Sequence, residues 1–484
     1  MQGFMLQLNR LSAAQWTFVI SLLLSGLAMC FQPVIGKDAA FYLDISQHFL
    51  DQGLTGAFSR FDWPWFPVLI ATSHSLTGIG LETVAFLWCA LFMAGACALM
   101  VDMVVRRLPG SGFWACLVVL AMPAFNAFRG EILREFGFWF FSVLTLWCAL
   151  RWQDRGGWLG ALGIQVSILL AALFRFEAVL LMPALVLWLA PGLRARDGWV
   201  RMAQLVVLPL CVVIAMTAML GGMLHLGRIE NFLGMVDPQQ VFSKFNAVSD
   251  RLASTVLMKY SADDAGNILV FGMLGVTLLM FAKLLGPFSI PFLTRTGWRG
   301  ARASLKSFDL FAWTWLFYLL VLMFFFVQQL FINSRYASFL DWLAVPLVVA
   351  GVYAFTQRFP RGGKGLAVLA VLVLLANVIS LSPKKTHYIE AGHWVAEHVE
   401  PDASVYYSDP RIGYYAGRGY EPRVLEQEEA LGDAGHGKFT YLLIEAKSDD
   451  AEVLQWLAAN GKVILAQFSN AKKKATVLVL GPAR

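Results

Sequence analysis

The chain is dominated by uninterrupted apolar stretches that are long enough to cross a lipid bilayer. Candidate spans lie at 14–34, 80–105, 112–128, 135–150, 157–174, 177–192, 203–226, 266–286, 309–332, 337–356 and 364–382. A membrane-crossing helix needs about 20 mostly apolar residues. Only 14% of the 484 residues are charged, whereas roughly 25% is usual in a soluble globular domain. The pattern predicts an α-helical polytopic membrane protein with about 11 transmembrane helices within residues 1–382.

The connections between these stretches alternate in charge. Five of them are basic and are represented by Arg106, Arg151, Arg196, Arg299 and Arg361. The positive-inside rule places such loops in the cytoplasm, together with the N-terminus and its Arg10. An odd number of spans then leaves residues 383–484 outside. The net charge of +6 is therefore a topology signal, and no nucleic-acid partner is expected.

The region around Arg175 decides the count of spans, because Arg175 and Glu177 interrupt one long apolar run. Two spans at 157–192 preserve the alternation of basic and non-basic loops, whereas a single span would invert every later loop. The sequence therefore favours a break in the helix at Arg175.

Three further segments complete the predicted organisation. Two outer loops, 35–79 and 227–265, mix charged and apolar residues at helical spacing, which favours interfacial helices over unstructured loops. Residues 383–484 contain 12 Lys+Arg and 14 Asp+Glu and no span-length apolar run. Their β-rich runs at 404–407, 440–445, 463–468 and 476–480 alternate with helix-like segments at 387–398 and 450–460. This indicates a small C-terminal α/β extracytoplasmic domain.

Charged side chains at the outer ends of spans are the candidates for chemistry, because a charge at the membrane boundary is costly without a partner. Such residues form five clusters on the predicted outer side. They contain Asp38, then Asp62, then Arg129, Glu131, Arg134 and Glu135, then Arg175 and Glu177, and finally Arg335 and Tyr336. We therefore expect acidic and arginine side chains from many helices to converge on one outward-facing cavity.

The order of these features resembles the GT-C glycosyltransferases, in particular the branch of protein O-mannosyltransferases and bacterial lipid A aminoarabinose transferases. The matching positions are Asp38, Tyr42 and Ile45 in the first outer loop, Asp62-Trp63-Pro64 further along it, and Arg335-Tyr336 with Pro346 in the tenth span. The segment HWVAEHVEPDASVYYSDPRIGYYAGR is similar to the soluble end of many members of the superfamily. The resemblance covers nearly the whole chain through short motifs.

The resemblance implies a membrane glycosyltransferase of the bacterial inner membrane. Such an enzyme moves a sugar from a polyprenyl-phosphate donor to an envelope glycan, lipid or protein acceptor on the outer face, with inversion at the anomeric carbon. Two positions depart from the branch. Ala39 follows Asp38 where the mannosyltransferases carry Glu, and Trp63 follows Asp62 where the aminoarabinose enzymes carry Lys. The sugar, the acceptor and the prenyl chain therefore stay open.

The chemistry of this transfer assigns roles to the candidates. A positioned carboxylate can remove the acceptor proton, which makes Asp38 the predicted general base and Asp62 the second catalytic candidate. The planar fork of arginine matches phosphate oxygens and stays charged at physiological pH. Arg335, with Tyr336 beside it, is therefore the leading donor ligand. The other predicted substrate-binding residues are Arg129, Arg134, Arg175, Glu131, Glu177 and Tyr42.

Most of these residues also have a structural alternative. Asp38 could be a solvated loop carboxylate, Asp62 a turn or helix N-cap residue, and Arg335 a boundary residue that snorkels. Glu177 with Arg175, and Glu131 with Arg134, could be structural ion pairs. A divalent metal shared by Asp38 and Asp62 is considered but not favoured, and no other cofactor is expected.

Two other functions compete with the transferase. A transporter or flippase of lipid-linked sugars would place charges near the bilayer midplane and repeat its halves. The acidic clusters here lie at span ends, and the sequence has no evident repeat. A catalytically silent scaffold, whose soluble domain recruits partners, is the third possibility, and the presence of Asp38 argues against it.

The predicted topology can be tested with reporter enzymes that are active only in an oxidising exterior. Fusions after residue 390 should be active, and fusions after residues 107, 155 and 300 should be inactive. Activity at residue 300 without activity at residue 390 would show that the map is inverted and that the helix break at Arg175 does not separate two spans.

Overall fold

The computed structural model describes residues 11–220, 234, 237–379, 384–421, 425–432, 435, 437–470, 472 and 476–483. The chain divides into two compact units. Unit 1 contains Met1–Leu27, Leu87–Arg129 and Arg134–Val378, and unit 2 contains Ala28–Phe86, Gly130–Leu133 and Ile379–Arg484. Arg10, and the predicted boundary between residues 382 and 383, lie outside the described residues.

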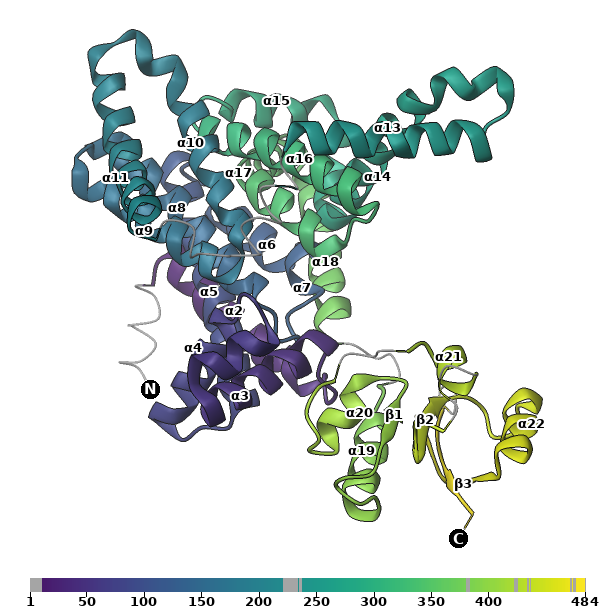
Figure 1. Ribbon diagram of the computed structural model, residues 1–484. Coiled ribbons are helices and arrows are strands. Elements are labelled where there is room, and N and C mark those ends of the chain that lie inside the picture. The colour runs from purple at the N-terminus through teal and green to yellow at the C-terminus, as the bar shows by residue number, and fades with distance from the viewer. Residues whose placement is uncertain are drawn as a thin grey trace. The chain divides into compact units, whose positions relative to one another are not determined.

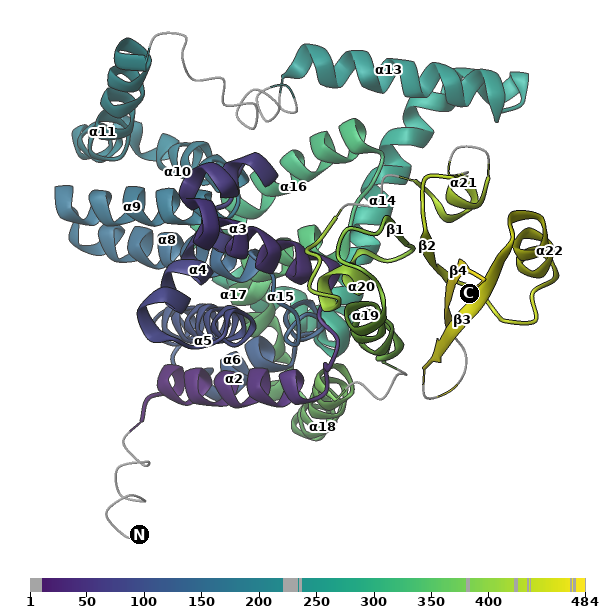
Figure 2. The same ribbon diagram turned by 60° about the horizontal axis from the view of Figure 1, so that its bottom comes forward.

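Unit 1 is built from helices (Figures 1 and 2). Its elements in chain order are α2 (Ala13–Cys30), α5 (Leu81–Arg107), α6 (Gly112–Ala121), α7 (Pro123–Asn126), α8 (Glu135–Arg155), α9 (Trp158–Phe174), η1 (Phe176–Leu180), α10 (Leu181–Leu189), η2 (Ala190–Arg194), α11 (Arg196–Leu220), α13 (Pro238–Thr255), η3 (Lys259–Asp264), α14 (Ala265–Leu285), η4 (Gly286–Leu293), α15 (Arg295–Ser304), α16 (Asp309–Gln329), α17 (Ser334–Arg358) and α18 (Pro360–Val378). The first residues of α5 and the last of α2 belong to unit 2.

Each predicted span coincides with helical structure over its described residues, and residues 221–226 and 380–382 of two spans lie outside the described part. Seven stretches of the described chain are long and apolar enough to cross a bilayer, and α6 and α9 are shorter apolar helices. The helical membrane fold is confirmed, whereas the number of crossings stays a prediction. The expected break also occurs: α9 ends at Phe174, Arg175 is extended with φ −142° and ψ 118°, and a 3-10 turn begins at Phe176.

Helix α17 forms the centre of unit 1. In its apolar span 83% of the residues are buried, compared with 28% in α16. Its aromatic side chains pack against neighbouring helices, since Trp342 stacks on Phe125 of α7 with ring centroids 3.9 Å apart and Phe339 contacts Phe138 of α8 at 4.8 Å. A helix enclosed in this way holds both of its ends in fixed positions, including Arg335 at its beginning.

The two long outer loops are helical where the structure describes them. Residues 227–233, 235 and 236 lie outside the described part, and α13 covers most of the remainder. Asp237 caps α13 by accepting a hydrogen bond from Gln239 N at 3.0 Å. Val241 of α13 packs with Met273 of α14 and Val327 of α16. The expectation of helices, rather than an unstructured loop, is confirmed for this part.

Unit 2 contains the other long loop, which folds into α3 (Lys37–Arg60) and α4 (Trp65–Thr77). Gly53 interrupts α3 with φ 67° and ψ −153°, a backbone conformation that favours glycine, so the element is two helices joined by a kink. Tyr42 of the first part packs edge-on against Phe66 of α4, with centroids 5.6 Å apart. These contacts bring the two ends of the loop together.

The C-terminal part of unit 2 is the predicted α/β domain. Its elements are α19 (His387–His398), β1 (Val405–Tyr407), α20 (Pro410–Tyr415), α21 (Gln427–Leu431), β2 (Tyr441–Glu445), α22 (Ala451–Asn460), β3 (Lys462–Ser469) and β4 (Thr476–Pro482). The sheet order is β1-β2-β4-β3, in which β1 and β2 are parallel and the other pairs antiparallel. All four predicted strands and both predicted helices are present within a few residues of their expected bounds.

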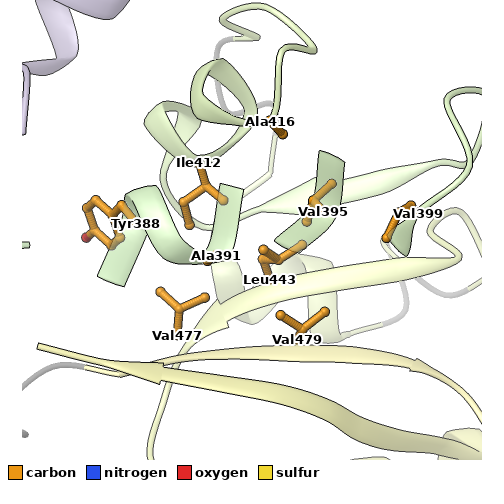
Figure 3. Close-up of a cluster of buried hydrophobic side chains, with 9 residues drawn as sticks. All are labelled: Tyr388, Ala391, Val395, Val399, Ile412, Ala416, Leu443, Val477 and Val479. Atoms are coloured by element: carbon orange, nitrogen blue, oxygen red, sulfur yellow. The ribbon is translucent and has the colours of Figure 1, made fainter. Parts of the chain in front are cut away.

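Alternating side chains of the sheet supply two separate cores. Val477 and Val479 of β4, with Leu443 of β2, face α19 and α20 (Figure 3). Leu478 and Leu480 point to the opposite face, where they pack with Val453 and Leu457 of α22. Because successive residues of a strand face opposite sides, the near-continuous apolar run of β4 is explained by burial on both faces.

Asp44 joins α3 to the C-terminal domain within unit 2. Its carboxylate is 6% exposed and accepts hydrogen bonds from Tyr420 N at 3.0 Å and Arg60 Nη2 at 3.2 Å. Arg60 also donates to Tyr420 O at 2.7 Å. Gly419 has φ 79°, and a Cβ there would lie 2.7 Å from Asp44 Oδ1. The turn at Gly419 therefore allows the backbone to approach the carboxylate closely.

We expect Asp44→Ala to loosen this connection, because it removes the acceptor of the Tyr420 N–H and one of the two acceptors of Arg60. The loss should be about 1.5–3 kcal/mol, the usual worth of a hydrogen bond to a charged group. Limited proteolysis of the purified protein in detergent would detect this loss of stability as faster cleavage between residues 384 and 421. Asp51→Ala is the matched control, since Asp51 lies on the same helix but is exposed. Equal cleavage rates for both variants would contradict the role of Asp44.

Candidate functional site

The strongest concentration of buried charge in unit 1 surrounds Arg175. Arg175 is 7% exposed and donates to Glu135 Oε1 and to Glu177 Oε1, both at 3.1 Å. The guanidinium also lies over the ring of Tyr336, 4.6 Å from its centroid. Removal of a charge from water is costly unless partners replace the water. These three contacts supply such partners, so the expected ion pair between Arg175 and Glu177 is present and Glu135 extends it.

Arg335 lies at the edge of this group. Its Nη1 is 4.0 Å from Glu135 Oε1, and its side chain is 24% exposed, compared with 9% for Arg175. Asn333 caps α17 by accepting from Arg335 N at 2.7 Å, which places Arg335 in the first turn. A cation at a helix N-terminus is disfavoured by the helix dipole. The position therefore favours an anion nearby, and Glu135 is one such group.

The group carries a formal excess of positive charge. Arg134 belongs to it as well, because its charge acts on Glu177. The arginines are Arg134, Arg175 and Arg335 and the carboxylates are Glu135 and Glu177, which gives three positive and two negative charges. The second oxygen of each carboxylate, Glu135 Oε2 and Glu177 Oε2, is buried and has no hydrogen-bond partner among the described residues. We name these five residues with Tyr336 the arginine cluster.

Arg129 does not join the arginine cluster. It is 3% exposed, and its guanidinium donates to Asn126 Oδ1 at 2.5 Å and to the hydroxyls of Ser21 and Ser25 at 2.9 and 3.2 Å. These partners hold Arg129 against α2, and no carboxylate pairs with it in the described part of unit 1. A buried arginine surrounded by hydroxyls can anchor one helix to another, and the role of Arg129 as a donor ligand stays a prediction.

In unit 2, Asp38 lies in the first turn of α3 and is partly buried. It is therefore part of a helix and not a solvated loop residue. The pKa of the Tyr420 phenol is raised, first by burial and then by the negative charge of Asp38, so the two groups lie close together. Glu131 lies at the same helix end, since a Cβ on Gly36 would be 3.5 Å from Glu131 Oε2. Negative charge is favourable at a helix N-terminus.

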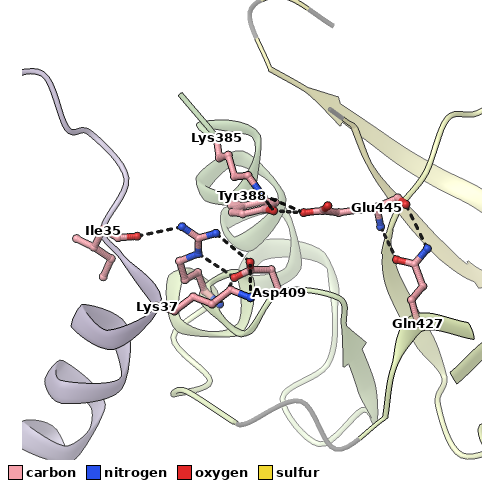
Figure 4. Close-up of polar contacts among 8 residues, drawn as sticks. Ile35, Lys37, Lys385, Tyr388, Asp409, Gln427 and Glu445 are labelled. Carbon is pink, nitrogen blue, oxygen red and sulfur yellow. Dashed lines mark hydrogen bonds and ion pairs between the residues drawn. The ribbon is translucent and has the colours of Figure 1, made fainter. Parts of the chain in front are cut away.

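The neighbouring residue Lys37 pairs with the C-terminal domain through Asp409, 3.5 Å from its Nζ (Figure 4). Arg411 donates to Asp409 through Nε at 2.8 Å and Nη2 at 2.9 Å, and to Ile35 O at 3.3 Å. Burial raises the pKa of Asp409, but the hydrogen bonds and charge of Arg411 outweigh it and hold that pKa below its usual value. The stabilisation of the fold by this ion pair is therefore complete above the ordinary aspartate pKa. It is lost as the pH falls through the lowered pKa of Asp409.

A second polar chain of the same domain lies beside this pair. Tyr388 donates a short hydrogen bond to Glu445, and Lys385 donates to Tyr388 at 2.6 Å (Figure 4). Gln427 bonds both backbone groups of Glu445, through Oε1 at 3.0 Å and Nε2 at 3.2 Å. These contacts fix the surface of the domain beside Arg411, whose guanidinium lies 4.8 Å from the Tyr388 ring.

Two other predicted residues of unit 2 have clear positions. Tyr42 is 5% exposed and packs in the interior of the α3–α4 pair, so the structure places its ring in a core. Asp62 is exposed in the turn that connects α3 to α4. The N-cap of α4 is Pro64, so Asp62 is not the cap of that helix. Among the residues that the structure describes, no three His, Cys, Asp or Glu side chains gather as metal ligands.

Two residues of these sites, Asp44 and Asp409, were not among the sequence candidates, and a third, Glu135, was named in a cluster without an assigned role. Glu135 is the central acceptor of the arginine cluster, and Asp44 and Asp409 fix α3 to the C-terminal domain. Glu135 follows Arg134 directly, so the sequence indicates a charged cluster there. It does not indicate that Glu135 pairs with Arg175. Asp44 and Asp409 find partners more than 350 residues away in the chain, and no local pattern indicates such pairs.

Comparison with known proteins yields matches only among solved structures. No protein-family model and no curated protein matches the chain. ArnT from Cupriavidus metallidurans in the apo state matches with a TM-score of 0.59 and 12% identity, over 96% of this chain and 97% of that chain. ArnT bound to undecaprenyl phosphate matches with a TM-score of 0.46 and 11% identity over the same shares. The apo match shows that the chain has a fold like that of ArnT.

Proposed function

We propose that this protein is a membrane glycosyltransferase that moves a sugar from a polyprenyl-phosphate donor to an envelope glycan, lipid or protein acceptor. The reaction takes place on the outer face of the bacterial inner membrane in this proposal. The observation that carries it is the arginine cluster, with its excess positive charge at the beginning of α17, in a fold that matches ArnT over 96% of the chain.

The donor presents its phosphate at the boundary between lipid and water, and the arginine cluster fits such an anion. Arg335 is the more exposed of the two arginines that contact Glu135 and is therefore the proposed primary ligand. Arginine binds phosphate oxygens through a planar fork. Arg175 is already saturated by Glu135 and Glu177, so its proposed role is to hold Glu135 in place beside Arg335.

The proposed general base is Asp38. Its carboxylate takes the proton of the acceptor hydroxyl while the acceptor oxygen bonds to the anomeric carbon of the sugar. The bond from that carbon to the phosphate oxygen breaks, and the electron pair leaves with the polyprenyl phosphate. Attack opposite the leaving group inverts the anomeric carbon. Arg335 would stabilise the charge that develops on the phosphate, and the proposed reaction needs no other cofactor.

A transporter or flippase of lipid-linked sugars is the second candidate. The buried group Arg175, Glu135 and Glu177 lies within a helical membrane protein, as such a function would require. A transporter would bind the same donor but would not consume it. Release of free polyprenyl phosphate therefore separates the two functions.

Asp38→Asn tests the reaction. The variant should insert and fold normally but lower turnover by roughly 10²–10⁴, because that is the usual contribution of a positioned base. The measurement compares envelope glycans of a deletion strain complemented with wild-type protein or with Asp38→Asn. Asp62→Asn is the control, and a loss confined to it would assign catalysis to Asp62. Wild-type glycan levels with Asp38→Asn would exclude Asp38 as the base.

Arg335→Ala tests the binding of the donor. Affinity for a polyprenyl-phosphate analogue should fall by at least about 1.5–3 kcal/mol, the worth of a hydrogen bond to a charged group. Arg335→Lys should recover only part of the affinity, because the planar fork is lost. Direct binding to purified, folded variants measures both effects. Affinity unchanged in Arg335→Ala would mean that Arg335 is a boundary residue and that the clamp lies with Arg134 or Arg175.

A further inference from the structure

Helix α15 has two contrasting sides. One side carries small residues that pack against α17, and α15 lies beside α17 in both ribbon views (Figures 1 and 2). A Cβ on Gly300 would lie 2.7 Å from Ala350 O and 2.5 Å from Ala354 Cβ, so only glycine fits there. Gly297 and Ala301 on the same side are buried. This close contact holds α15 firmly against the C-terminal half of α17.

The other side of α15 carries a row of positive charges, which we name the basic stripe. The stripe consists of Arg295, Arg299 and Arg302 of α15 and of Lys306, which lies two residues beyond the end of the helix at Ser304. The spacings of four and three residues put the three arginines on one face of α15. All four residues are exposed, and none forms an ion pair with a described residue. The stripe therefore offers uncompensated positive charge to an external anion.

An apolar cavity of about 470 Å³ opens beside the stripe. Trp298 and Ala301 of α15 line it, together with Phe281, Trp315 and Leu347 from α14, α16 and α17. A second cavity of about 600 Å³ includes Lys306 of the stripe and shares Ala312 with the first. Ligand sites typically occupy about 300–1,000 Å³ and are mainly apolar with a few polar groups. Positive charge and apolar space thus adjoin at the end of α15.

The cavities also contain polar groups that define the ligand. Trp315 lines the first cavity, and its indole Nε1 is buried with no hydrogen-bond acceptor among the described residues. A buried donor without an acceptor is unfavourable, and an ester carbonyl of a lipid would accept its hydrogen bond. Asp309 in the second cavity is held by neutral donors, since its Oδ1 accepts from Trp188 Nε1 at 3.0 Å and from Leu310 N at 2.8 Å.

The basic stripe is remote from the arginine cluster. Helix α15 contacts α17 at Ala350 and Ala354, and Arg335 lies 15–19 residues earlier on the same helix. At about 1.5 Å per residue the separation is roughly 22–28 Å, close to the roughly 30 Å thickness of the hydrocarbon core. A lipid whose phosphate lies at the stripe therefore has its headgroup at the other membrane face from Arg335.

We propose that α15 and the two cavities form a binding site for an anionic membrane glycerophospholipid. The phosphate and headgroup lie on the basic stripe, and an acyl chain fills the apolar cavity beside Trp298 and Trp315. Basic pockets between membrane helices bind anionic headgroups in this way, and each Lys or Arg near the membrane surface strengthens the binding. The site is independent of the proposed transfer reaction and does not use its donor.

The experiment is native mass spectrometry of the purified protein in micelles that contain phosphatidylglycerol or phosphatidylcholine with the same acyl chains. The wild type should retain phosphatidylglycerol preferentially. Arg299→Gln with Arg302→Gln removes two exposed charges and should weaken that retention roughly tenfold or more. Arg194→Gln with Arg196→Gln is the matched control, because both residues are exposed and form no ion pair with a described residue. The control should retain the lipid as the wild type does.

The apolar half of the site is tested separately by Ala312→Phe, which fills the space that both cavities share. This variant should lose both lipids while it still binds a polyprenyl-phosphate analogue. Equal retention of phosphatidylglycerol and phosphatidylcholine by the wild type would overturn the proposal. A loss of phosphatidylglycerol from the Arg194→Gln, Arg196→Gln control equal to the loss from the Arg299→Gln, Arg302→Gln variant would overturn it as well. Displacement of phosphatidylglycerol by the polyprenyl-phosphate analogue would also overturn it, since the cavity would then belong to the donor.

Discussion

The cost of placing charge in a membrane protein organises unit 1. Arg175 tolerates burial because two carboxylates and an aromatic ring replace the water that it loses. To reach Glu135 and Glu177, the chain must leave the helical path at Arg175 and resume it one residue later. The break between α9 and η1, the burial of Glu135 and the position of Tyr336 at the start of α17 are all consequences of satisfying one guanidinium.

Most of the fold was predictable because its signals are local. Apolar stretches give membrane helices directly, and the strands of the C-terminal domain coincide with their β-rich runs. The break at Arg175 was also predicted, because two spans at 157–192 preserve the alternation of basic and non-basic loops. The kink at Gly53 was not predicted, since a single glycine in an amphipathic helix leaves several conformations open.

The site was predictable in its residue types and less so in its partners. The sequence identified Arg175, Glu177, Arg335 and Tyr336, which the structure brings together in the arginine cluster. It also placed Arg129 among them, whereas the structure bonds that side chain to the serines of α2. Spacing along the chain gives the depth of a charge in the membrane but not the direction in which a long side chain extends. The convergence of all five clusters on one cavity stays a prediction.

The bond between Asp44 and Tyr420 has a consequence for biosynthesis. The two residues are 376 positions apart, and a ribosome adding about 5–20 residues per second needs roughly 20–75 s to pass from one to the other. During that interval the Asp44 carboxylate has Arg60, His48 and water as its partners, but not the Tyr420 N–H that donates to it in the finished fold. The segment that carries Asp38 therefore reaches its final arrangement only after the chain is nearly complete, so a truncated product that lacks the last 70 residues would insert in the membrane without a finished first loop.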